Sequence, residues 1–312
     1  MKLELPGPRE APAILRALYT AAAHDGPLIA AEKSMLNAAR ELMGAQAAVI
    51  EQTITPKELA DAVSSVALRR QVLSGMVVMN LLDEAGSPED AAFVNSFASE
   101  LGVDSNEVRN LQQIADGDLF TMKLDVARRV WITEHLAERW NKGGLRWLAR
   151  AVGTKLGLAE ETKLADRYRA LGHLPQGTVG RTYFDSMRAD GFPLPGEKGS
   201  QVEPVVIHDL MHVLSGYATD AEGEIQTAAF SAGNRRQDPF TYLFFVLCQF
   251  HLGIIEAPFS FSARGRFDPA AVVRAVNRGM AVTTDLSSGW DPWSIMALTV
   301  DDARASLGVP PV

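Results

Sequence analysis

Two histidines and two carboxylates within seventeen residues are the side chains of this sequence best suited to chemistry. The segment 208–212 reads HDLMH, and eleven residues separate it from Glu224. Imidazole nitrogens and carboxylate oxygens are common ligands of divalent transition metals. The segment therefore indicates a site that could hold one divalent metal ion, and the elements around it must bring these groups together.

The spacing of apolar residues predicts a helix that carries both histidines. Pro204 suits the first turn of a helix, and Gly216 suits its left-handed end. Residues four apart stack on one face, so His208 and His212 can bind one ion. Asp209 is rotated by about 100° from His208, so it would ligate from the flank or orient a ligating histidine. The apolar stripe consists of Val206, Ile207, Leu210, Met211 and Leu214.

A second helix should follow a short turn at 215–220. Asp220 can cap this helix and place Glu224 in its first turn, and an antiparallel return would bring Glu224 toward the histidines. Glu222 is the rival carboxylate, but it would face elsewhere. The motif is not HExxH, so the general base of zinc proteases is missing. On this pattern alone, the alternative is a pair of core histidines bonded to the backbone or to Asp209.

The pattern HDxxH-x11-E resembles the Coq4 family of ubiquinone-biosynthesis proteins. Three further stretches share the resemblance: LPQGTVGRTY at 174–183, Gly-Tyr at 216–217, and the C-terminal WDPW at 290–293 with DARASLGV at 302–309. Together they cover residues 160–312. The resemblance implies an all-helical fold and one divalent metal, zinc, iron, manganese or cobalt, held by His208, Asp209, His212 and Glu224.

The resemblance also implies a role on polyprenylated aromatic acids, through oxidative decarboxylation in quinone assembly and through organisation of the biosynthetic complex. We therefore expect an enzyme, a metal-dependent decarboxylase, oxygenase or lyase. Iron or another redox-active ion would suit an oxygen-dependent reaction, whereas zinc would act as a Lewis acid. Two alternatives stay open: a non-catalytic lipid-binding or scaffold protein, and a tailoring enzyme of a natural-product pathway.

The apolar run 240–255 should form a buried helix, along which a prenyl tail could lie. His251 in this run is expected to be a hydrogen-bonded core residue rather than a proton shuttle. Arg235 and Arg236 could hold a phosphate or carboxylate, but their polar neighbours favour a solvated loop.

The first half of the chain contains two similar segments, 18–44 and 79–102. Each reads as an apolar helix, a turn with Asp and Gly, an acidic first turn and an amphipathic helix. This pattern resembles the TerB-like helical domain of tellurite-resistance proteins over residues 10–117. Asp25 and Glu32 could bind a cation there, but helix capping is the favoured role for an acidic residue early in a helix.

These elements predict an all-α chain with two helical domains joined by a connecting helix. The expected boundaries are 1–120 for the TerB-like domain, 121–155 for connecting helices and 156–312 for the Coq4-like domain. Trp131, Trp140 and Trp147 should lie on the connecting helix, which Gly143-Gly144 would break.

The composition restricts the partners. The net charge is −8 with scattered basic residues, so we expect no nucleic acid. A single cysteine and the absence of an apolar signal core indicate a cytoplasmic protein, with peripheral contact at the inner membrane as an option. The expected partners are a small aromatic acid or prenyl lipid and other biosynthetic enzymes, and a homodimer is compatible with the sequence.

Overall fold

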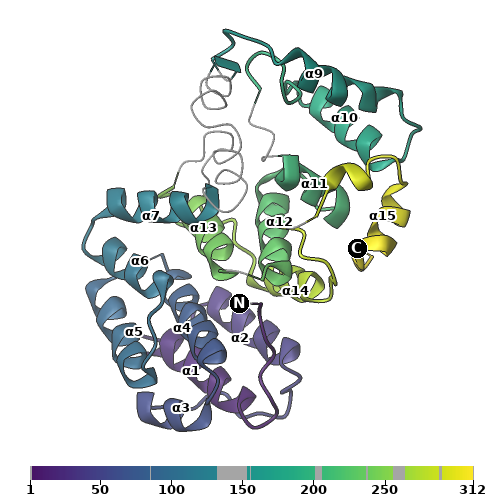
Figure 1. Cartoon of the computed structure of the whole chain (residues 1–312). Helices are drawn as coiled ribbons and strands as arrows, with labels where there is room; N and C mark the ends of the chain where they lie inside the picture. The colour runs from purple at the N-terminus through teal and green to yellow at the C-terminus, as the bar shows by residue number, and fades with distance from the viewer. Residues whose placement is uncertain are drawn as a thin grey trace. The chain divides into compact units, whose positions relative to one another are not determined.

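The fold is all-α, as the sequence predicts, and it divides into two compact units (Figure 1). One unit combines Met1–Val130 with Asp220–Met280, and the other combines Trp131–Thr219 with Ala281–Val312. Among the described residues, the extended pairing is limited to an isolated bridge between Thr178 and Thr299, and no helix is long and apolar enough to cross a membrane. The computed structural model describes residues 2–84, 86–131, 153–154, 156–200, 206–236, 238–255, 264–287 and 290–311.

The first unit is built from helices of both halves of the chain. Its buried residues are mainly Leu, Val, Ala and Met, and α1 packs on α4 while α14 packs on α2 and α12. In the described part of this unit the helices are α1 (Ala11–Ala23), α2 (Ala30–Leu42), α3 (Pro56–Ala62), α4 (Val66–Leu81), α5 (Pro88–Leu101), α6 (Asn106–Ala115), α7 (Leu119–Trp131), α12 (Ala221–Asn234), α13 (Phe240–Phe250) and α14 (Pro269–Met280). The last residue of α7, Trp131, belongs to the other unit.

The two similar segments of the first half form helix pairs, α1 with α2 and α4 with α5. Glu32 has the capping role that the sequence favours, because its carboxylate accepts the Ile29 N–H at 2.8 Å at the start of α2. In the second segment, Asp90 accepts the Ser87 N–H at 2.6 Å in the same way. Burial raises the pKa of Glu32, and the nearby carboxylate of Asp25 adds to this effect.

The division of the chain differs from the expected domain boundaries, because α12, α13 and α14 pack with the N-terminal helices. The closest approach is between α12 and α14. A Cβ on Gly233 would collide with the Val276 carbonyl, and one on Gly279 would collide with the Phe230 carbonyl. These glycines therefore let the two helix backbones touch.

A buried ionic network also ties residues 220–280 to the first 130 residues. The Arg129 guanidinium lies 3.1 Å from Glu107 and 3.3 Å from Asp238, and it donates to the Thr241 hydroxyl at 2.7 Å. The side chain of Glu107 is 7% exposed and that of Arg129 is 11% exposed. The network therefore joins α6 and α7 to the start of α13.

His251 and Arg235, which flank α13 in the sequence, are both buried. His251 is a hydrogen-bonded core residue, as expected, because its Nε2 lies 2.9 Å from the Leu82 carbonyl oxygen. The solvated loop expected for Arg235 is wrong. This arginine is 5% exposed, and its guanidinium lies 4.7 Å from the centre of the Tyr242 ring. Stacking on an aromatic face compensates the buried guanidinium for its lost hydration. Arg236 beside it is exposed.

The second unit contains the histidine helix and the segments that resemble the Coq4 family. Most of the expected connecting segment, with Trp140, Trp147 and Gly143-Gly144, lies outside the described residues. In the described part of this unit the helices are α9 (Thr162–Arg169), the 3-10 turn η1 (Ala170–His173), α10 (Val179–Ala189), α11 (Val206–Ser215), the 3-10 turn η3 (Pro292–Ser294) and α15 (Val300–Leu307).

Candidate metal centre

Helix α11 brings the two histidines of the motif together. The Nε2 atoms of His208 and His212 lie 3.3 Å apart, and the two rings are nearly perpendicular at 87°. His212 is 8% exposed, whereas His208 is partly exposed. The apolar stripe explains this placement, because Val206, Leu210, Met211 and Leu214 are buried and set the rotation of the helix. The expected helix start at Pro204 lies outside the described residues.

The turn after α11 fixes the orientation of His212. Gly216 has a φ of 77°, the left-handed conformation expected at a helix end, and it turns the chain so that Tyr217 comes back over the ring. The His212 Nδ1 lies 3.2 Å from the Tyr217 carbonyl oxygen. Because a carbonyl oxygen only accepts, Nδ1 must carry the proton, and the Nε2 lone pair then points toward His208.

The spacing of the histidine nitrogens fits a metal ion between them. Two nitrogens at about 2.0–2.1 Å from a tetrahedral zinc ion lie about 3.3–3.4 Å apart. The observed separation of the His208 and His212 Nε2 atoms is 3.3 Å. A ligating histidine usually donates its other N–H to a carbonyl or carboxylate, and His212 does so with Tyr217. The spacing is compatible with a bound ion and also with a direct hydrogen bond between the two rings, and the metal itself stays a prediction.

The expected carboxylate ligand lies in the first turn of α12. Asp220 caps this helix by accepting the Gly223 N–H at 2.8 Å, as the sequence predicts. Glu224 lies in this first turn and is partly buried, and its part as a ligand beside the histidines stays a prediction. The rival Glu222 lies 4.0 Å from Arg266, and its side chain is 66% exposed.

Asp209 is the remaining residue of the predicted ligand set. It lies partly buried on α11, one residue beyond His208. Its position fits the flank role that the helical geometry predicts, in which it would orient the site rather than complete the histidine pair. Its part as a ligand stays a prediction.

The C-terminal segment that resembles the Coq4 ending holds the end of α11. The Arg304 guanidinium donates to the Leu214 carbonyl at 2.9 Å and to the Val213 carbonyl at 3.3 Å. These carbonyls belong to the last turn of the helix, where no further turn is present to satisfy them. Arg304 therefore fixes the end of the helix that carries the histidines, a role that the spacing of the motif does not reveal.

The glycine-rich segment that begins at Leu174 connects α10 to this C-terminal segment. Val179 and Gly180 donate their backbone N–H groups to the Leu298 and Met296 carbonyls, each at 2.9 Å. A Cβ on Gly180 would lie 2.8 Å from Leu171 and 3.0 Å from the Met296 oxygen. This close backbone approach requires glycine, and α10 in turn packs on α11.

Comparisons with protein-family models, curated proteins and solved structures give no match for this chain. The likeness to the Coq4 family therefore depends on the motif residues alone.

Proposed function

We propose that this protein is a metal-dependent enzyme that acts on an aromatic carboxylic acid. His208, His212 and Glu224 would hold the metal ion, with Asp209 as a further ligand or an orienting group. The observation that carries the proposal is the histidine pair on α11, with facing Nε2 atoms 3.3 Å apart and one ring oriented by a backbone carbonyl. The Coq4-like motifs support a substrate of the prenylated aromatic type and a decarboxylation.

The protein side chains would contribute binding and orientation. The chemistry that a bound divalent ion would supply is a positive charge for a carboxylate and a neighbouring phenol oxygen, with electron transfer added if the ion were redox-active. The Tyr217 carbonyl would keep the His212 proton on Nδ1, so that Nε2 would be the atom that binds the metal. Arg304 keeps the end of α11 in place.

The ligand assignment is tested by titrating the chelator-treated protein with Zn²⁺ and measuring heat release. We expect Glu224→Ala to weaken zinc binding by at least about tenfold, since removal of a group that interacts with a ligand already costs about 10–100-fold. Glu222→Ala is the matched control, because Glu222 is exposed and lies in the same helical turn. Equal zinc affinity of Glu224→Ala and the wild type would contradict the assignment.

The enzymatic part of the proposal needs a separate test. The metal-loaded protein should release CO₂ from an aromatic carboxylic acid, and His208→Ala should abolish this release while its circular dichroism and melting stay close to the wild type. A variant that unfolds would instead indicate a structural metal and favour the scaffold alternative. CO₂ release by a metal-free variant would contradict a metal-dependent reaction.

A further inference from the structure

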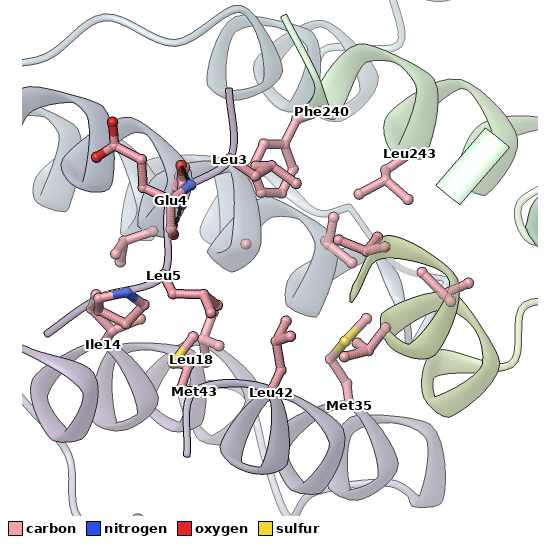
Figure 2. A pocket seen from close by; sticks show the side chains of 18 of the residues that line it. Leu3, Glu4, Leu5, Ile14, Leu18, Met35, Leu42, Met43, Phe240 and Leu243 are labelled. Atoms are coloured by element: carbon pink, nitrogen blue, oxygen red, sulfur yellow. Dashed lines mark hydrogen bonds between the residues drawn. The ribbon is translucent and has the colours of Figure 1, made fainter. Parts of the chain in front are cut away.

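The first unit contains an apolar cavity that the proposed metal chemistry does not use. Its volume is about 150 Å³, and it is lined by residues 3–6 and by side chains of α1, α2, α4, α13 and α14 (Figure 2). Except for Glu4 and Gln71, every lining residue is apolar. Cavities of about this size with apolar walls stay dry and bind benzene or xenon.

The two polar residues of the wall satisfy each other. The Glu4 N–H donates to the Gln71 Oε1 at 2.8 Å, and the Gln71 Nε2 donates to the Glu4 carbonyl at 2.8 Å. The Glu4 carboxylate points away from the cavity (Figure 2). No polar group of the wall is thus directed at an occupant, so the enclosed part of a ligand must be hydrocarbon.

The segment 3–6 lies across the cavity as a strap. Leu3 is 8% exposed, whereas Leu5 is 52% exposed although both residues line the cavity (Figure 2). The hydrogen-bond pair with Gln71 fastens the strap to α4. Extended backbone held by two hydrogen bonds can open locally at low cost, which gives a ligand a way in.

The walls suit an occupant of variable shape. Met35, Met43 and Met280 come from α2, from the residue after α2 and from the end of α14, and all three face the cavity. Methionine side chains adapt to irregular ligands because they are unbranched and polarizable. An empty apolar cavity of this size costs stability, so an occupant would stabilise the unit.

We propose that this cavity binds a hydrocarbon group of about six carbons, either the end of an alkyl or isoprenoid chain or an apolar ring. The shared chemistry is a ligand with no polar atom in the enclosed part. This site goes beyond the proposed metal chemistry and does not depend on it, because all the lining residues belong to the first unit.

The test uses the full chain with ¹³C-labelled methionine methyl groups. We expect n-hexane, which represents a chain end, or benzene, which represents a ring, to shift the signals of Met35, Met43 and Met280 saturably. The tighter of the two probes identifies the kind of group. Met187 and Met296 lie in the second unit and should not respond. The absence of a saturable shift with both probes would overturn the proposal.

Matched variants locate the binding. Val72→Phe fills the cavity from α4 and should weaken binding by at least about tenfold, or 1.4 kcal/mol, whereas Val66→Phe on the same helix is 52% exposed and lies outside the lining. If Val72→Phe does not fold, Val273→Phe on α14 replaces it, since Val273 is only half-buried. Undiminished binding in the filled variant would overturn the proposal. His212→Ala should bind both probes as the wild type does, which separates this test from that of the metal.

Discussion

At the level of single residues, the position of the proton on the His212 ring decides which of its nitrogens could bind a metal ion. The Tyr217 carbonyl requires a proton on Nδ1, and this directs the Nε2 lone pair toward His208. The sequence pattern shows that the two rings share a helical face, but it does not show which nitrogen is protonated. Tyr217 belongs to the Gly-Tyr pair of the motif, yet its contribution is a backbone atom, which leaves no signal in side-chain chemistry.

Glu197 gives a pH-dependent prediction for the second unit. Its carboxylate accepts both Arg188 Nη groups, at 2.7 and 2.9 Å, and the Leu194 N–H at 2.8 Å, and it lies 2.9 Å from the Arg169 Nε. The Arg188 guanidinium is the largest cause that lowers the pKa of Glu197, from 4.5 to about 2. A lowered folded-state pKa stabilises the fold above pH 4.5, and this stability is lost as the pH falls through about 2.

We therefore expect Glu197→Gln to lower the free energy of unfolding near neutral pH, because the neutral amide loses the ionic hydrogen bonds to the arginines. The loss should be only about 1–2 kcal/mol, since solvent screens the partly exposed arginine partners. The difference from the wild type should shrink as the pH falls from 4.5 toward 2. Urea denaturation at several pH values measures it. Asp166→Asn is the control, since this carboxylate is 65% exposed beside Arg169. A difference that grows on acidification would contradict the account.

At the level of elements, α11 depends on a partner from the far end of the chain. Arg304 satisfies two carbonyls of its last turn, so Arg304→Met should lower the free energy of unfolding by about 1–3 kcal/mol. Denaturant melting measures the effect. Asp301→Asn should have little effect, because this carboxylate is 93% exposed in its ion pair with Arg304. Equal stability of both variants would show that α11 does not need this contact.

The crossing of α12 and α14 should tolerate no added methyl group. In Gly279→Ala the new Cβ would meet the Phe230 carbonyl, so the helices must separate, and overpacking of this kind costs about 1–3 kcal/mol. The change should appear as a lower melting temperature. Gly26→Ala is the matched control, because a Cβ there meets nothing within 4 Å. A melting temperature of Gly279→Ala equal to that of the control would refute the tight crossing.

Local signals in the sequence predicted the end of α11, the start of α12 and, far from the site, the start of α2. Asp220 and Glu32 cap their helices, and Gly216 ends α11, because each acts through atoms within a few residues. The environment of Arg235 was not predicted, since its neighbour Tyr242 becomes relevant only when the chain turns back into α13. Capping is local chemistry, whereas burial depends on which distant element covers a residue.

At the level of the whole molecule, the two compact units interleave along the chain. The Asp220 cap and the apolar run from Phe240 correctly indicated α12 and α13, but these signals do not specify which helices the two pack against, and α14 was not predicted. The pairing of Gly233 and Gly279 is the feature that could have suggested the α12–α14 crossing. The assignment of these helices to the unit of the first 130 residues required the structure.

The Arg129 network should be essential for this joining of distant segments. Arg129→Leu would leave Glu107 buried without its cation, so the free energy of unfolding should fall by about 3–5 kcal/mol. Arg128→Leu is the matched control on the same helix, because its side chain is 70% exposed in a 3.8 Å pair with Asp125. Denaturant unfolding of both variants compares them, and similar losses in the two would contradict a structural role for the network.

The central claim is that the histidine pair on α11 holds a divalent metal, and metal analysis of the protein purified without chelator or nickel tests it most directly. We predict about one equivalent of zinc, iron, manganese or cobalt in the wild type, and its loss in a folded His212→Ala variant. Metal that persists in His212→Ala, or a wild-type protein that neither contains metal nor takes up any of the four added ions, would contradict the claim.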